Sequence, residues 1–280
     1  MPGRQRTTQI NQGRTLDALR QLSTFEEALS RLLFVVEHQR PCGLILGHAG
    51  TGKSALIEIL REELSTPTCT PIVVDLQTSS STMIAWKIAV GMGLSPNPQD
   101  APELLWTAID DRLAGASSSE TMYVPLFDHL EQADECTAAA VTRCCHIFAR
   151  RSGSVILCGR PQVPHELIDV VRSMCDLRIE LPLWSVGETA QFVAQTQEGK
   201  SGPQYTGGAI GVLHHCAGGR LSDVQQLLRL TGFAAETQEI EKIDAKFVES
   251  IASEIWRPVT QLDDVSHHPP TILELAAFSQ

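Results

Sequence analysis

Short apolar runs alternate with amphipathic segments along the first two thirds of the chain. Five runs have the length of strands and occupy residues 43–46, 71–76, 123–128, 154–158 and 176–181. Between them, apolar residues recur at helical spacing over residues 25–36, 54–60, 83–92, 104–113 and 137–151. Ser23 and Thr24, followed by Glu26 and Glu27, predict a capping box at the start of the first helix. Strands that alternate with helices predict an α/β fold with a mainly parallel sheet flanked by helices.

From Trp184 onward the pattern is helical only. Apolar residues recur at three- to four-residue spacing over residues 186–195, 209–217, 221–230 and 245–255. These segments predict a second, smaller all-α domain. The expected organisation is a flexible basic tail (1–22), an α/β domain (23–184), an all-α domain (185–257) and a C-terminal tail (258–280).

The composition of the chain limits the classes of partner. Its 280 residues are 42% hydrophobic and 20% charged, values that exclude a disordered chain. The formal net charge of −11 disfavours a general nucleic-acid binder, which is usually basic. The first twenty residues are an exception, because their only acidic residue is Asp17, whereas they contain the arginines Arg4, Arg6, Arg14 and Arg20. This segment is either a solvated terminus or an arm that contacts an anion such as a phosphate backbone.

The cysteines and the hydropathy pattern indicate a compartment. The eight cysteines include no C-x-x-C pair, and several lie in apolar runs, so we expect small buried thiols. No stretch approaches 18 apolar residues, and no N-terminal signal pattern is present. The sequence therefore predicts a cytoplasmic protein without a membrane span.

The strongest chemical signal is a glycine-rich loop between a predicted strand and a predicted helix. Its sequence matches G-x-x-x-x-G-K-[ST], the P-loop or Walker A motif. In such a loop, glycines let backbone amides turn toward phosphate oxygens, and the positive end of the helix adds attraction. The lysine contacts the β- and γ-phosphates, and the hydroxyl residue binds Mg²⁺. We expect these residues to bind ATP or ADP: Gly47, His48, Ala49, Gly50, Thr51, Gly52, Lys53 and Ser54.

A second carboxylate is needed to hold the metal. Asp128 closes the apolar run 123–127, which suits the Walker B role, so Ser54 and Asp128 are the candidate Mg²⁺ ligands. His129 follows, where many P-loop ATPases carry a glutamate that orients the attacking water. Glu131 is a candidate substitute, and His129 is a candidate weak base. The sequence therefore predicts nucleotide binding more strongly than fast hydrolysis.

Several segments together resemble the AAA+ ATPases. They are the P-loop, the strand ending at Asp128, the strand 154–158 that runs into Gly159-Arg160-Pro161, and the helical C-terminal part. More narrowly, the segments 155–161, 178–189 and 216–221 are similar to bacterial ATPases of the ExeA type and to the transposition regulators Mu B and TniB. The resemblance covers roughly residues 23–255. It implies a P-loop parallel sheet with a helical lid and an ATP- and Mg²⁺-dependent activity.

The same resemblance implies roles for particular arginines. Arg220 would be the sensor-2 arginine, which reaches from the lid to the nucleotide. Because AAA+ sites usually lie between subunits, Arg172 or Arg178 would be an arginine finger in a homo-oligomer. The chain departs from the family pattern at His129, at Arg160, where a small polar residue is common, and at Ala49, where proline is frequent. Arg160 would be either a sensor-1 variant or a contact for a partner.

Three functions are compatible with these residues. The first is an ATP-binding regulatory ATPase whose nucleotide controls self-assembly and an unknown protein partner. The second is an ATP-dependent DNA-binding adaptor of the transposition type, which the basic N-terminal arm favours and the net charge disfavours. The third is a weakly hydrolysing nucleotide switch or scaffold, which His129 after Asp128 favours.

Overall fold

The computed structural model describes residues 13–97, 99–116, 121–198 and 202–256. They form two compact units that divide between Leu183 and Trp184. The first unit is built on one five-stranded parallel sheet with the strand order β2-β3-β4-β1-β5. Its strands are β1 (Cys42–Gly47), β2 (Cys69–Asp75), β3 (Met122–Asp128), β4 (Val155–Gly159) and β5 (Cys175–Leu181). The five predicted strands and the predicted parallel sheet are therefore confirmed.

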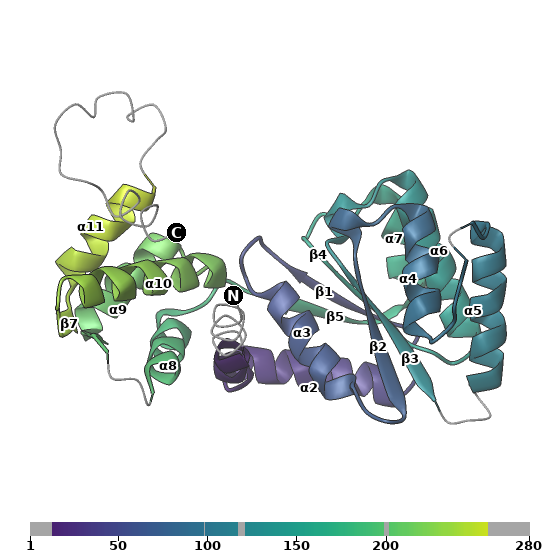
Figure 1. The fold of residues 1–280 in the computed structure, drawn as a ribbon, viewed down its shortest axis with the longest axis horizontal. Coiled ribbons are helices and arrows are strands. Elements are labelled where there is room, and N and C mark those ends of the chain that lie inside the picture. Colours follow the sequence, from purple (N-terminus) through teal and green to yellow (C-terminus); the bar gives the residue numbers. More distant parts are fainter. Residues whose placement is uncertain (1–12, 98, 117–120, 199–201, 257–280) are drawn as a thin grey trace. The chain divides into compact units, whose positions relative to one another are not determined.

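Helices cover both faces of this sheet, as Figure 1 shows. On one side lie α2 (Ser23–Glu37) and α3 (Lys53–Leu64), and on the other α4 (Ser81–Gly91), α5 (Pro102–Ala116), α6 (Glu135–Arg150) and α7 (Ile168–Met174). Apolar side chains of the strands pack against α4, α5 and α6 in one core cluster, for example Leu44, Leu46, Val74, Phe127 and Leu157. Burial of each such side chain contributes about 1.5–3 kcal/mol, so this packing holds the strand ends in place.

One glycine of this layer lets α4 approach β2 closely. A Cβ added at Gly91 would lie 2.7 Å from Cγ2 of the buried Ile72 side chain. We expect Gly91→Ala to lower the free energy of unfolding by about 1–2 kcal/mol, because overpacking outweighs the gain in helix propensity. Urea-induced unfolding measures this change. The matched control is Gly115→Ala in α5, where a Cβ meets nothing within 4 Å; unchanged or higher stability is expected there.

The described part of the expected N-terminal tail is folded. Residues 13–20 are helical, and Leu19 and Leu22 are buried. Arg20 forms ion pairs with Glu62, at 2.7 Å, and with Glu63, both on α3. The prediction of a flexible tail is therefore wrong for residues 13–22, because tertiary contacts bury their few apolar side chains. Residues 1–12, and with them Arg4 and Arg6, lie outside the described residues.

The starts of two helices bear on the predicted capping box. The predicted capping box at Ser23 is wrong, since α2 follows Leu22 without a side-chain cap. A capping box does occur at the start of α8, where the Ser185 side chain accepts from the Glu188 amide and Glu188 accepts from the Ser185 amide.

The prediction of buried thiols holds for Cys42, Cys69, Cys144, Cys145 and Cys158.

The second unit is helical, as the sequence predicts. It contains α8 (Val186–Gln197), α9 (Gly207–Ala217), α10 (Leu221–Thr237) and α11 (Ala245–Ile255). It also contains one element that the pattern does not reveal, a short parallel pair of β6 (Gln204–Tyr205) and β7 (Lys242–Ile243). The rings of Trp184 and Phe192 pack edge to face at 5.1 Å within this unit. The expected C-terminal tail, 258–280, lies outside the described residues.

Within the part of the chain that the structure describes, no helix combines the length and the apolar character needed to cross a membrane.

Candidate nucleotide-binding site

The glycine-rich loop connects the carboxyl end of β1 to the amino end of α3. Gly50 and Gly52 have φ angles of 79° and 100°, in the left-handed region that glycine adopts without strain. The Thr51 hydroxyl donates to the carbonyl oxygen of His48 at 3.0 Å and closes the loop. Gly47 is tightly packed, since a Cβ there would lie 2.7 Å from Thr51 Oγ1 and 2.9 Å from the Leu181 carbonyl oxygen. The glycines of the motif are therefore required by the conformation of the loop.

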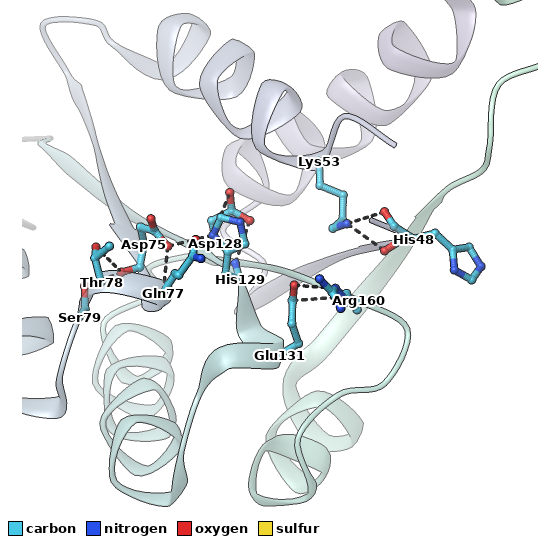
Figure 2. Close-up of polar contacts among 11 residues, drawn as sticks. His48, Lys53, Asp75, Gln77, Thr78, Ser79, Asp128, His129, Glu131 and Arg160 are labelled. Atoms are coloured by element: carbon cyan, nitrogen blue, oxygen red, sulfur yellow. Dashed lines mark hydrogen bonds and ion pairs between the residues drawn. The ribbon is translucent and has the colours of Figure 1, made fainter. Parts of the chain in front are cut away.

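Lys53 begins α3 and lies back over the loop (Figure 2). Its Nζ donates to the carbonyl oxygens of Gly47, at 2.9 Å, and of His48, at 2.8 Å. The Lys53 side chain is largely buried, whereas Ser54 on the next position of the helix is exposed. The ammonium group thus occupies the concave side of the loop, where a phosphate oxygen can replace the carbonyl oxygens as its partner.

Asp128 is the last residue of β3 and is only 6% exposed. Its Oδ1 accepts from the His129 amide at 2.8 Å. Asp75 is the last residue of the neighbouring strand β2, and the strand register places it opposite Asp128. His129 adopts a φ of 61°, which is unusual for a residue other than glycine. Its Nδ1 lies 2.9 Å from Asp75 Oδ1. Two carboxylates and one imidazole therefore meet at the carboxyl ends of β2 and β3.

Glu131 has a different partner. Its Oε2 accepts from the Arg160 amide at 3.1 Å, and its Oε1 lies 3.1 Å from Arg160 Nε. Gly159 allows this approach, because a Cβ there would lie 2.7 Å from Leu130 Cβ and 3.2 Å from Glu131 Oε2. The Glu131 side chain is 12% exposed and that of Arg160 is 49% exposed. Figure 2 shows the Glu131 carboxylate directed at Arg160, and His129 directed at Asp75.

The pKa of the Cys158 thiol is affected by several charged residues of the site. Cys158 lies on β4, between the strands that carry the loop and Asp128. Burial raises the pKa of the Cys158 thiol well above its ordinary value; the negative charge of Asp128 raises this pKa further, and the positive charge of Lys53 lowers it. Glu131 also raises this pKa. Lys53, Asp128 and Glu131 therefore all lie near enough to influence this thiol.

The residues at this edge fit a bound Mg²⁺. Mg²⁺ takes oxygen ligands and usually binds through one or two protein oxygens together with phosphate oxygens and water. Asp128 supplies a buried carboxylate whose Oδ2 lies 3.8 Å from His129 Nδ1. Ser54 supplies an exposed hydroxyl in the first turn of α3. A carboxylate and a hydroxyl beside a phosphate-binding loop are the donor set that this metal uses in P-loop proteins.

The structure also places the three candidate arginines. Arg172 is exposed on α7, and Arg178 is exposed on β5, 2.6 Å from Glu180. Arg220 precedes α10 directly after a turn in which Gly218 and Gly219 have φ angles of 57° and 71°. Its side chain is 57% exposed, with Nη1 at 3.4 Å from Asp223. The sensor and finger roles of these arginines stay predictions.

Two members of the site were missed by the sequence reasoning. Asp75 and Cys158 carry no motif of their own. Both stand at or near the carboxyl end of a predicted strand, which is the edge where ligands bind in parallel sheets. That position was the signal that could have identified them.

Comparisons with known proteins find one similar family and several similar folds. Residues 36–167 match the model of a family described as the AAA domain. No protein of curated function matches the chain. Similar solved structures include the Orc1 protein of Aeropyrum pernix in complex with DNA, with a TM-score of 0.66 and 19% identity, covering 82% of this chain and 65% of that one. Cdc6p of Pyrobaculum aerophilum has a TM-score of 0.69 and 13% identity, covering 84% of this chain and 68% of that one.

A third similar structure is the RuvB Holliday junction branch migration motor of Thermotoga maritima. It has a TM-score of 0.53 and 13% identity, covering 82% of this chain and 68% of that one. The chain thus spans about two thirds of the length of these structures. At such low identities the likeness concerns the fold alone, and it confirms the predicted parallel sheet flanked by helices. The narrower resemblance to ExeA-type ATPases stays a prediction.

Proposed function

We propose that this chain, whose residues 36–167 match the AAA domain family, binds Mg-ATP as a regulatory ATPase whose nucleotide controls self-assembly and a protein partner. The observation that carries the proposal is that Lys53 lies against the loop 47–54 at the end of β1, while Asp128 ends β3 at the same edge of the sheet, as Figure 2 shows. A phosphate-binding loop, a buried carboxylate and an acid are the groups that phosphoryl transfer requires.

Each group has a distinct task in this proposal. The amides of the loop bind the phosphate oxygens, and Lys53 exchanges its contacts with Gly47 and His48 for the β- and γ-phosphates. Ser54 and Asp128 hold Mg²⁺, which neutralises charge on the phosphates when it is bound. Glu131 orients the attacking water. Arg220 would act as the sensor-2 arginine, and Arg172 or Arg178 would contact the nucleotide of a neighbouring subunit.

The experiment that tests this proposal combines binding, turnover and mass. The purified chain should bind ATP and ADP in the presence of Mg²⁺, release phosphate from ATP, and change its oligomeric mass with nucleotide. Calorimetry, a phosphate-release assay and light scattering measure the three quantities. Failure to bind either nucleotide would contradict the proposal as a whole, whereas unchanged mass would contradict only the nucleotide-dependent assembly.

A weakly hydrolysing switch is favoured by a specific observation. Both groups that could activate water are already engaged, Glu131 by Arg160 and His129 by Asp75. Turnover would then be slow until a partner displaces Arg160. In this case the protein binds Mg-ATP as proposed, and the nucleotide acts mainly as a signal.

The Glu131–Arg160 pair gives this idea a test. We expect Arg160→Ala to raise the turnover of ATP up to about fivefold, because an exposed ion pair contributes up to about 1 kcal/mol. The double variant Arg160→Ala/Glu131→Gln should lose the gain, and Arg150→Ala, a matched exposed arginine on α6, should leave turnover unchanged. Phosphate release at saturating Mg-ATP is the measurement. Lower turnover in Arg160→Ala would contradict a restraining role.

A DNA-binding adaptor is the other alternative. It is supported by the names of two neighbours, an Orc1 protein in complex with DNA and a Holliday junction motor. It is weakened by the net charge of −11 and by Arg20, which is paired with Glu62 and Glu63. Binding to duplex DNA at low salt, where electrostatic affinity is greatest, decides the matter.

A further inference from the structure

Three thiols converge at the edge of the sheet opposite to the glycine-rich loop. Cys42 begins β1, Cys175 begins β5, and Cys145 lies on α6. The Sγ atoms of Cys42 and Cys175 are 2.8 Å apart, and Cys145 lies near enough to raise the pKa of the Cys42 thiol. None of these groups belongs to the nucleotide site.

An irregularity in the strand pairing creates this cluster. Cys42 pairs with Cys175, but the next pair is Gly43 with Leu177, so Asp176 is an extra residue in β5. Without this β-bulge, the register would place Asp176 beside Cys42. The bulge turns Cys175 toward the core cluster that contains Cys42 and Cys145, while Asp176 is exposed. Bulges commonly re-aim one side chain in this manner.

The backbone geometry also suits a covalent link between the two strands. Neighbouring strands lie about 4.7–4.9 Å apart. This spacing falls within the range of about 4.4–6.8 Å for the Cα atoms of disulfide-bonded cysteines. A pair of cysteines at directly paired positions, such as Cys42 and Cys175, therefore suits the Cα spacing of a disulfide.

We propose that Cys42 and Cys175 are a reversible disulfide site that reacts with low-molecular-weight disulfides such as oxidised glutathione. Cys175 loses its proton and attacks one sulfur of glutathione disulfide, which forms a mixed disulfide and releases one glutathione. Cys42 then loses its proton and attacks the Cys175 sulfur, which releases the second glutathione. Two protein thiols are oxidised and one glutathione disulfide is reduced to two thiols.

The environment sets the order of these steps. Cys42 is fully buried, and its hydrogen bonds with Cys145 and Cys175, together with burial, raise the pKa of its thiol. Cys175 is only partly buried, so it is the thiol that a small oxidant reaches first. Cys42 is then the resolving thiol, held beside the mixed disulfide by β1.

The disulfide would constrain the strands that frame the site. The two cysteines are 133 positions apart, so the link closes a long loop that contains the P-loop and Asp128. Closing a long loop restricts the unfolded chain and stabilises the folded one. We expect the oxidised protein to melt on the order of 10 °C higher than the reduced protein.

The test uses the full-length wild-type chain, so it does not depend on the folding of a variant. The native protein is incubated with oxidised glutathione, free thiols are blocked, and peptides are mapped by mass spectrometry without reduction. The expected result is a Cys42–Cys175 peptide, the higher melting temperature, and reversal of both by dithiothreitol. A Cys42–Cys145 peptide, or glutathione retained on Cys175 without a crosslink, would overturn the proposal.

Two variants complete the experiment. Cys175→Ser should abolish the crosslink and the shift in melting temperature, because a hydroxyl cannot replace the reactive thiol. Cys136→Ser removes an exposed thiol at the start of α6 and should leave both unchanged. Retention of the full shift in Cys175→Ser would also overturn the proposal. Neither residue takes part in nucleotide binding, so the outcome is independent of the proposed function.

Discussion

Replacement of Lys53 by alanine is expected to weaken the binding of Mg-ATP by about a hundredfold. The ammonium group lies on the concave side of the loop, 2.9 Å from the Gly47 carbonyl oxygen and 2.8 Å from that of His48. Hydrogen bonds to charged groups contribute about 1.5–3 kcal/mol, and about 3 kcal/mol corresponds to a hundredfold change in Kd. Calorimetric titration of the purified variant with Mg-ATP measures the loss.

The control for this variant is Lys246→Ala, an exposed lysine on α11. Its affinity for Mg-ATP should equal that of the wild type. The Lys53→Ala protein should keep the circular dichroism of the wild type, because the lost contacts are local to the loop. An unchanged affinity in a folded Lys53→Ala protein would rule out the loop as the phosphate site.

Replacement of Asp128 by asparagine is expected to lower the turnover of ATP by about a hundredfold. Asparagine keeps the oxygen that accepts from the His129 amide, so the end of β3 should retain its conformation. The amide lacks the negative charge that holds and orients Mg²⁺, and losses of metal-orienting groups cost about 10–100-fold. Phosphate release measured over a range of Mg²⁺ concentrations should show both lower turnover and a higher requirement for Mg²⁺.

A second measurement separates metal binding from nucleotide binding. ATP affinity in the presence of a chelator should be equal in Asp128→Asn and in the wild type, because Lys53 and the loop amides remain. Asp110→Asn is the control, since this carboxylate pairs with Arg151 on the surface of the α5–α6 layer. Wild-type turnover and Mg²⁺ dependence in Asp128→Asn would mean that another group holds the metal.

Much of the fold could be predicted because its signals are local. A buried strand in a parallel sheet is a short apolar run, and a helix repeats its apolar positions every three or four residues. Both kinds of element were therefore visible in the sequence, within a few residues of their ends. The loop 47–54 was equally visible, because its glycines and its lysine are consecutive along the chain.

Features that depend on long-range contacts were not predicted. The helix over residues 13–20 has few apolar side chains, and it is stabilised by tertiary contacts, namely the burial of Leu19 and the ion pairs of Arg20 with α3. The pairing of His129 with Asp75 depends on β2 lying beside β3. The contact of Glu131 with Arg160 likewise depends on β4 ending next to the helical turn that follows β3.

The sequence by itself determined the class of the fold and the phosphate-binding loop, since both follow from residues that are neighbours in the chain. Tertiary structure alone decided which charged groups meet around Asp128, because strand order brings together residues that are far apart in sequence. It also decided that Cys42 faces Cys175 and not Asp176, through one bulge in β5. The physical reason is the same in both cases: side-chain contacts are set by the register between strands, and register is a property of the folded sheet.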